Sequence, residues 1–581
     1  MFTPLPSPTA VPPLNPNLAL GRFPLLPPQN PWTRPQFHAI CPDTVHRFRS
    51  IFSILATLCF GLGGCNRAMD RADLVLLNGS EPETLDPALI TGQPEGRVAY
   101  ALFEGLAAYD HTGTPQPGVA ARWETSPDGR IYTFHLRSEA RWSNGDPVTS
   151  ADFVRSWERT LRPVTASEYA YQLHYIRNAK DYSEGRLKDF SQVGIQAPDP
   201  ATLVVTLENP TPFWIDLCCF STLLPVHVPS VEALEKEGRV FTKPGLLVSN
   251  GAYVLREWRL FDRIRLEKNP HYWNQGKVGM RTVDILPAAK PMTAFNLYST
   301  GVADLLMDKG LAPSMLMEQL RKRPDFHAAP FLGNYFVRFN CARKPFQDPR
   351  VRLAFSLVID KRYLTEHISR AGETPAHSLV PPGTAGYEPP TGLERDPDRA
   401  RKLLAEAGYP GGKGFPLISY LFKGDSDLDQ GIGIELQAMF KRELGVHMEL
   451  VQQEWKVYLN SLSSLDYDLC RSSWVGDYKD PNTFMDMFVT GGGNNRTGWS
   501  HPKYDALIAQ AARELDPKTR FALFQEAESI LIRSEAPICP LFYYVGIQFY
   551  DGSKLGGIAA NLIDEHPIKN MFWKERPTGS R

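Results

Sequence analysis

The stretch WETSPDGRIYTFHLRSEARWSNGDPVT, residues Trp123–Thr149, holds the clearest local signals in the chain. Ser126-Pro127-Asp128-Gly129 has the composition of a tight turn, because proline presets one backbone angle and glycine tolerates a positive one. The turn joins two extended runs, the second of which is Ile131–Leu136. Such an arrangement predicts a β-hairpin.

Strand and helix signals alternate along the rest of the chain. Three Asp-Pro pairs, Asp348-Pro349, Asp396-Pro397 and Asp516-Pro517, predict helix starts, with aspartate as N-cap and proline in the first turn. The second of these helices is expected to close at Gly408. Interleaved strands and helices predict an α/β fold with largely parallel sheets. Strands are expected at Leu74–Leu77, Ile131–Leu136, Thr202–Leu207, Tyr335–Phe339 and His447–Val451.

Several blocks together resemble one family. Trp123–Gly129, Tyr132–Arg137 and Trp142–Thr149 look like the signature region of the oligopeptide-, dipeptide- and nickel-binding family of bacterial solute-binding proteins. The ordered set of blocks, from about residue 74 to 550, is most similar to the oligopeptide branch. The other matching blocks are Asn78–Glu81, Leu85–Pro87, Leu102–Leu106, Asp152–Val154, Ser156-Trp157, Asn250–Tyr253, Lys268–Trp273 and Trp474–Tyr478.

The resemblance implies a two-lobed, type II-like periplasmic-binding-protein fold of the α/β class, with a hinge cleft between the lobes and an extra N-terminal subdomain. Closure about the hinge would enclose the ligand. By the order of the blocks, we expect lobe I at 66–93, 218–287 and 540–581, its extra subdomain at 94–217, and lobe II at 288–539.

The resemblance also implies a function. We expect a monomer that captures short peptides and delivers them to the permease subunits of an ABC transporter. In such proteins the peptide lies extended and pairs through its backbone with protein strands, which makes binding tolerant of side-chain sequence. Its side chains occupy roomy, water-containing pockets.

Site residues are carried over by motif match. Asp477 is expected to pair with the α-ammonium group of the peptide. Arg471 and Arg343 match positions whose cations neutralise the carboxylate of shorter peptides, and guanidinium groups suit that task. Backbone hydrogen bonds are expected from Ser473, Val475, Thr91, Gly92 and Gln93, with Gly476 beside them and Trp474 and Tyr169 lining the cleft.

Two aspartates can also be interpreted locally, and a third departs from the family pattern. Asp480 precedes Pro481 and has the pattern of a helix N-cap. Asp477 has no such structural role and is flanked by aromatic residues, where a carboxylate needs a cationic partner if it is desolvated; an exposed loop aspartate is the alternative. Asp429 stands where the family offers a histidine to the carboxylate of longer peptides, so the preferred peptide length stays open.

The N-terminal region is interpreted separately from the fold. Residues 1–44 contain 12 of the 50 prolines and read as an untranslated or disordered extension, with translation starting at Val45. Arg47 and Arg49 followed by an apolar run of about a dozen residues indicate a signal peptide at 45–64. Because Leu62-Gly63-Gly64-Cys65 resembles a lipobox, Cys65 is expected to be lipidated and to anchor the protein in the cell envelope or periplasm.

Composition and motifs exclude other classes. A formal net charge of −1 leaves no basic field for nucleic acid. Metalloprotease, nucleophile-elbow, P-loop and dinucleotide-binding motifs are absent from the sequence, so we expect no enzyme, no cofactor and no metal. The adjacent Cys218-Cys219 is interpreted as core packing. Two alternatives remain open: the same fold binding an oligosaccharide or another non-peptide solute, and a two-carboxylate hydrolase.

Overall fold

The computed structural model describes residues 71–424 and 426–575. The predicted extension 1–44, the Val45 start, the signal peptide 45–64 and the lipidated Cys65 lie outside these residues. Among the helices that are described, none combines the length and the apolar character needed to cross a bilayer.

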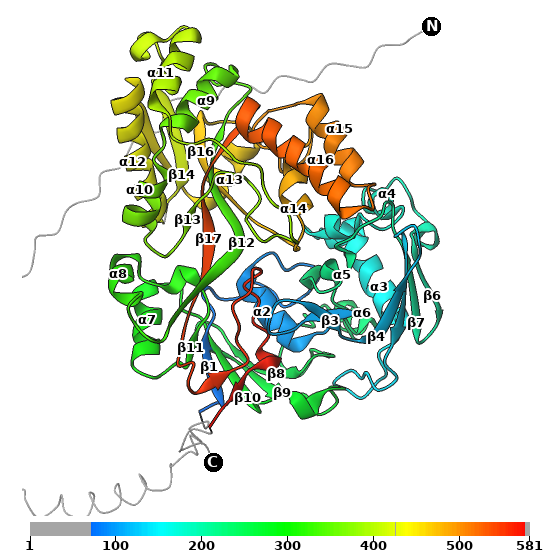
Figure 1. The fold of residues 1–581 in the computed structure, drawn as a ribbon. Coiled ribbons are helices and arrows are strands. Elements are labelled where there is room, and N and C mark those ends of the chain that lie inside the picture. Colours follow the sequence, from blue (N-terminus) through cyan, green and yellow to red (C-terminus); the bar gives the residue numbers. More distant parts are fainter. Residues whose placement is uncertain (1–70, 425, 576–581) are drawn as a thin grey trace, which may run out of the picture. The chain divides into compact units, whose positions relative to one another are not determined.

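Most of the described strands belong to one large sheet (Figure 1). In pairing order its strands are β15 (Met448–Gln453), β14 (Ile418–Lys423), β16 (Leu469–Val475), β12 (Phe326–Phe339), β17 (Ile538–Tyr550), β11 (Leu305–Leu306), β1 (Leu74–Leu77), β10 (Thr282–Leu286), β9 (Arg263–Lys268) and β8 (Tyr253–Arg259), with β13 (Thr374–Pro375) beside β17. The long strands β12 and β17 stand in the middle of this order and run side by side in Figure 1. They therefore connect the two halves of the sheet.

The prediction of largely parallel sheets is wrong. β1 pairs in parallel with β10 and β11, and β14 pairs in parallel with β15 and β16. The long strands β12 and β17 are antiparallel to each other, and β8, β9 and β10 form an antiparallel meander. Strand and helix signals alternate along the sequence, but they do not reveal these long returning strands, which pair antiparallel.

The predicted hairpin belongs to a second, four-stranded antiparallel sheet. Its strands are β4 (Ala120–Thr125), β5 (Ile131–Leu136), β7 (Thr202–Thr206) and β6 (Ile195–Asp199), in that pairing order. Gly129 donates its backbone N–H to the Ser126 carbonyl at 2.8 Å and has a φ of +68°, which confirms the turn. Two small sheets pair β2 (Ala107–Tyr109) with β3 (Pro115–Pro117) and β18 (Leu555–Gly556) with β19 (Phe572–Trp573).

The three helices predicted from Asp-Pro pairs are confirmed. Asp348, Asp396 and Asp516 each accept a backbone N–H in the first turn of the helix that follows. The α-helices are α2 (Gln93–Leu102), α3 (Ser150–Leu161), α4 (Ala179–Ser183), α5 (Trp214–Leu217), α6 (Val228–Lys236), α7 (Pro291–Ser299), α8 (Met317–Leu320), α9 (Pro349–Val358), α10 (Lys361–Tyr363), α11 (Pro397–Glu406), α12 (Asp427–Leu444), α13 (Trp455–Ser463), α14 (Asn482–Met485), α15 (Pro502–Ala511) and α16 (Pro517–Ser529).

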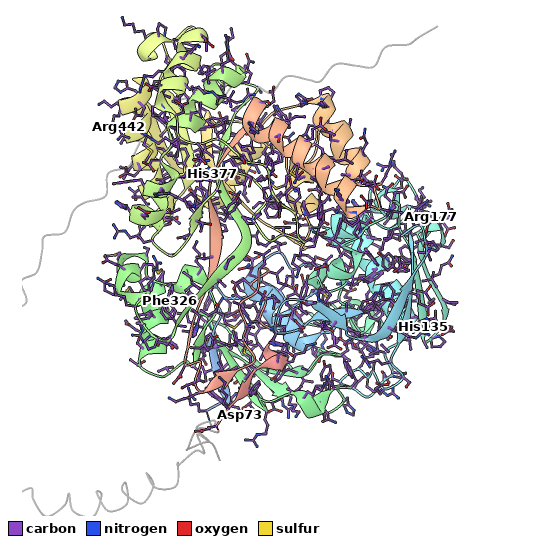
Figure 2. The ribbon with its side chains drawn as sticks, viewed as in Figure 1. Asp73, His135, Arg177, Phe326, His377 and Arg442 are labelled. Carbon is purple, nitrogen blue, oxygen red and sulfur yellow. The ribbon has the colours of Figure 1, made fainter. Side chains whose placement is uncertain are left out.

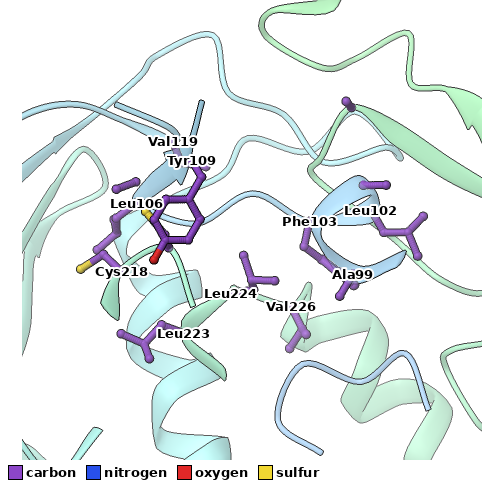
Figure 3. Packing of buried hydrophobic residues seen from close by; sticks show 14 of the residues in the cluster. Ala99, Leu102, Phe103, Leu106, Tyr109, Val119, Cys218, Leu223, Leu224 and Val226 are labelled. Atoms are coloured by element: carbon purple, nitrogen blue, oxygen red, sulfur yellow. The ribbon is translucent and has the colours of Figure 1, made fainter. Parts of the chain in front are cut away.

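Helix α2 is held by a large hydrophobic cluster. Figure 3 shows Leu102 and Phe103 at its end, near Leu224 and Val226 of a distant segment. Cys218 and its neighbour Cys219 are buried in the same cluster, which confirms their interpretation as core residues. The cluster fixes the position of the helix whose first turn lines the cavity described below.

The lobe boundaries stay a prediction, and the packing favours moving two of them. Phe295 of α7 packs in one cluster with Val75 of β1, although 288–539 is the predicted second lobe. Phe542 stacks on Tyr335 of β12, in the predicted second lobe, with ring centroids 4.9 Å apart, although 540–581 is assigned to the first lobe. Where β12 begins, Phe326 (labelled in Figure 2) packs on Phe549 of β17. The long strands β12 and β17 therefore pack with both halves of the large sheet.

Candidate functional site

A cavity of about 690 Å³ brings together all but one of the predicted site residues. One group comes from the end of β16 and the loop after it, and a second group comes from the segment around the start of α2. The first group is Arg471, Ser473, Trp474, Val475, Gly476 and Asp477, and the second is Thr91, Gly92 and Gln93, joined by Tyr169. A cavity of this size suits a small ligand of several residues.

The cavity meets the part of β16 where one edge is not covered by any strand among residues 71–424 and 426–575. On one side β16 pairs with β12 as far as Val475, which lies opposite Gly333. On the other side β14 pairs only with Leu469 and Cys470, so from Arg471 onward no described strand covers this edge. Ser473 and Val475 line the cavity here. This backbone can receive an extended segment as an additional strand.

Asp477 is held directly after this strand. Gly476 donates its N–H to the Leu332 carbonyl at 2.8 Å, and a Cβ on Gly476 would lie 2.7 Å from Leu332 Cδ2. The backbone N–H of Asp477 donates to Thr483 Oγ1 at 3.1 Å. Its Oδ2 accepts hydrogen bonds from Gln172 Nε2 at 2.8 Å and Tyr171 Oη at 3.1 Å.

The side chains that donate hydrogen bonds to the carboxylate of Asp477 are neutral. Within residues 71–424 and 426–575, no lysine, arginine or histidine nitrogen lies within 4.0 Å of it. Desolvation raises the pKa of Asp477 to about 6, although the hydrogen bonds from Tyr171 and Gln172 oppose this rise. A cation that entered the cavity would find a fixed carboxylate whose charge is not neutralised by the protein.

Residues 114–496 match the bacterial extracellular solute-binding proteins, family 5 (middle region). The chain belongs to this family. It is 36% identical over 513 residues to the periplasmic oligopeptide-binding protein OppA of Escherichia coli K12, and the match covers 87% of this chain and 93% of OppA. The solved structure of the Escherichia coli murein tripeptide binding protein MppA is similar with a TM-score of 0.77, at 35% identity, and covers 87% of this chain and 99% of MppA.

Family membership confirms the predicted α/β, type II periplasmic-binding-protein fold. It does not by itself select the ligand. Another similar protein, the probable deoxycholate-binding periplasmic protein YgiS of Escherichia coli K12, is 34% identical over 478 residues, covering 80% of this chain and 87% of YgiS. The ligand of the present protein therefore has to be inferred from the charges in its own cavity.

Arg471 already has an anionic partner in the cavity. Its guanidinium lies 3.3 Å from the carboxylate of Asp429, whose side chain is 1% exposed. Asp429 also accepts a hydrogen bond of 2.9 Å from Tyr335 Oη. Asp429 therefore neutralises Arg471 rather than standing alone against a ligand carboxylate. The sequence singled out both residues but not their pairing, because 42 positions separate them.

Arg343 is the predicted site residue that the structure does not bring to the cavity. Its guanidinium is about half exposed and lies 3.4 Å from Asp466 and 3.4 Å from Asp468. These two carboxylates follow the helix α13 and precede β16. Arg343 is therefore a surface ion-pair residue in this structure.

Asp480 has a larger role than a helix cap. Its Oδ1 accepts the backbone N–H of Asn482 at 2.9 Å, but the N-cap position of α14 is Pro481. Asp480 is also buried in a two-pronged ion pair with Arg520 of α16, with distances of 2.7 and 2.8 Å. The prediction of a simple cap is corrected accordingly. The arginine lies 40 positions away, beyond the reach of a local pattern.

The sequence analysis missed several cavity residues. Lys309, Tyr544 and Glu565 line the cavity from segments that carry no local motif. Lys309 pairs with Glu373 at 2.7 Å and lies over the ring of Tyr544. Among the described residues, no cluster of three or more His, Cys, Asp or Glu side chains has an arrangement that would hold a metal ion.

Proposed function

We propose that this protein is a lipid-anchored solute-binding protein that captures short peptides and delivers them to the permease of an ABC importer. OppA and MppA are named for binding oligopeptides and a murein tripeptide, respectively, and both resemble this chain over most of their length. Anchoring would occur through Cys65, so Cys65→Ser should move the protein from the membrane fraction to the soluble fraction.

The observation that supports the peptide proposal most is that the carboxylate of Asp477 has no cationic partner within 4.0 Å among the described residues. A carboxylate in a partly desolvated cavity is costly unless a cation joins it. The α-ammonium group of a peptide is such a cation, and it carries three N–H donors. Tyr171 and Gln172 already fix one oxygen of the carboxylate, so the ammonium group would meet a preorganised partner.

The open edge of β16 supplies the second element of recognition. A peptide whose ammonium group rests on Asp477 would run antiparallel to Ser473–Val475, because Asp477 follows the C-terminal end of β16, and would pair with that backbone. Thr91, Gly92 and Gln93 would contribute from the segment before α2. Every peptide has the same backbone groups, so this mode favours broad side-chain tolerance.

The carboxylate end of the peptide would be recognised more weakly. Arg471 is the predicted partner, but Asp429 offsets its charge. Arg343 is engaged at the surface and takes no part in the proposed site. We therefore place the main charge recognition at the ammonium end.

Ligand identification tests the proposal directly. Protein purified from its native envelope should release short peptides with free amino termini on denaturation, measured by mass spectrometry. Recovery of an oligosaccharide or a steroid acid such as deoxycholate would overturn the peptide proposal. An anionic ligand would be repelled by Asp477, and a neutral sugar would leave its charge unpaired.

A further inference from the structure

The cavity contains a second carboxylate whose role the proposed function does not explain. Of the acidic residues that line it, Asp308 pairs with Arg97 at 3.1 Å and Asp429 pairs with Arg471. Asp564 accepts hydrogen bonds from Gln548 and His566. Among the described carboxylates that line the cavity, those of Asp477 and Glu565 are the two with no ion pair inside 4.0 Å.

Cations near Glu565 are already matched elsewhere. Arg97 is engaged by Asp308 and by the side-chain oxygens of Asn78 and Gln93. Lys569, which lines a small adjoining space with Glu565, pairs with the buried Glu104 at 2.6 Å. Neither cation therefore forms an ion pair with Glu565 within 4.0 Å.

The backbone of Glu565 is fixed from both sides. The buried side chain of Asn561 accepts the N–H of Glu565 at 3.2 Å and donates to its carbonyl at 3.0 Å. The preceding residue, Asp564, has a φ of +53° and lies against β17. It fits there because position 546 is glycine, where a Cβ would come 2.1 Å from Asp564 Oδ1. The carboxylate of Glu565 is thus carried by a loop whose backbone is fixed by these contacts.

Two tyrosine rings line the same spaces as Glu565. Tyr100 and Tyr109 line both the large cavity and the small space that Glu565 borders. Figure 3 shows the ring of Tyr109 standing beside Leu106 and Val119. The face of such a ring accommodates an alkyl chain and attracts a cation.

We propose that Glu565, with Tyr100 and Tyr109, forms a subsite for the positively charged side chain of a peptide residue such as lysine, ornithine or arginine. The alkyl stem would lie along the rings and the ammonium or guanidinium group would pair with Glu565. Burial raises the pKa of Glu565 to about 7 by more than the nearby charges of Arg97 and His566 lower it, and a bound cation would lower this pKa further. The inference rests on the proposed function, because it assigns a side-chain preference to the same peptide.

Calorimetry with matched tripeptides tests the subsite. One lysine is placed at the first, second or third position of a trialanine background, and each peptide is compared with its norleucine counterpart, which has a similar length and no charge. For the wild-type protein, lysine should bind about 10- to 100-fold more tightly than norleucine at one of the three positions. Glu565→Gln should remove this ratio and leave norleucine peptides bound as in the wild type.

The controls separate failure of the subsite from failure of the proposed function. Glu388→Gln removes an exposed acid outside the cavity and should preserve the lysine preference. Retained binding of norleucine peptides shows that Glu565→Gln is folded. A lysine-to-norleucine ratio that Glu565→Gln leaves unchanged at all three positions would overturn the subsite alone. If the wild-type protein binds none of the free tripeptides, the proposed function fails with it.

Discussion

The guanidinium of Arg471 lies 3.3 Å from the buried carboxylate of Asp429, inside the cavity that is also lined by Asp477. Arg471 contacts Tyr335 and Tyr544 as well, with its guanidinium 5.0 Å from the centre of the Tyr335 ring. The arginine that the family resemblance assigns to a peptide carboxylate is therefore already paired. In the proposed function, this arrangement makes recognition of the carboxylate end of a peptide weaker than recognition of its ammonium end.

Asp429→Asn should make Arg471 available to a ligand. The amide oxygen can still accept the hydrogen bond from Tyr335, while the charge that offsets Arg471 is gone. The preference for a tripeptide with a free carboxylate over its C-terminal amide should rise about tenfold, which corresponds to ~1.4 kcal/mol. Calorimetry with both peptides on wild type and Asp429→Asn measures this preference. Asp427→Asn is the matched control, since Asp427 is exposed in the first turn of the same helix, and a rise seen equally in both variants would contradict the role of Arg471.

Peptide affinity should fall as the pH drops below about 6. Asp477 pairs with an ammonium group only when ionised, and its pKa of about 6 leaves it largely ionised at pH 7.5 and largely protonated at pH 5. A bound ammonium group lowers this pKa, so binding below pH 6 must release a proton, and affinity should weaken by up to about tenfold per pH unit. Calorimetry with trialanine from pH 5 to 7.5 would show the slope.

The groups around Asp477 provide the control for this pH dependence. Tyr169 and Tyr171 stay protonated in this range, because desolvation and the Asp477 charge raise their pKa values. The pKa of Asp486 is raised to about 7 by its own desolvation and by Asp477. In Asp477→Asn the slope between pH 5 and 7 should disappear; a slope that persists would assign the titration to another group, such as Asp486 or Glu565.

Asp480→Ala should destabilise the fold strongly. It leaves Arg520 buried without its carboxylate, a loss that costs about 3–5 kcal/mol in the free energy of unfolding. Asp516→Ala removes the N-cap of α16, the helix that carries Arg520, and should cost only about 1 kcal/mol. Denaturant unfolding of both variants compares the two. Similar losses would mean that Asp480 contributes as a helix cap alone.

Local signals in the sequence predicted local structure well. The turn at Ser126–Gly129 and the three Asp-Pro helix starts depend on residues within a few positions, and each is present. Asp477 was singled out by motif match, by its aromatic flanking residues and by the lack of a capping role. The α/β alternation, in contrast, gave no sign that β12 and β17 return antiparallel.

Pairings across the sheet could not be predicted in the same way. Arg471 with Asp429, Asp480 with Arg520, and Arg343 with Asp466 and Asp468 are set by which strands and helices become neighbours. The same holds for Glu565, which enters the cavity from a loop held by Asn561. Motif matching identified residue types that suit charge recognition, while the fold decides which of those charges are already neutralised.

The central claim is that Asp477 holds the ammonium group of the peptide, and calorimetry with free and N-acetylated tripeptides on wild type and Asp477→Ala tests it most directly. Wild type should bind the free peptide about two to three and a half orders of magnitude more tightly than Asp477→Ala does, as expected for about 3–5 kcal/mol. Wild type should also reject the acetylated peptide. The losses of affinity caused by Asp477→Ala and by N-acetylation should not add, because both remove the same interaction. Asp516→Ala should keep the wild-type preference. Equal affinity of wild type for free and acetylated peptide would contradict the account.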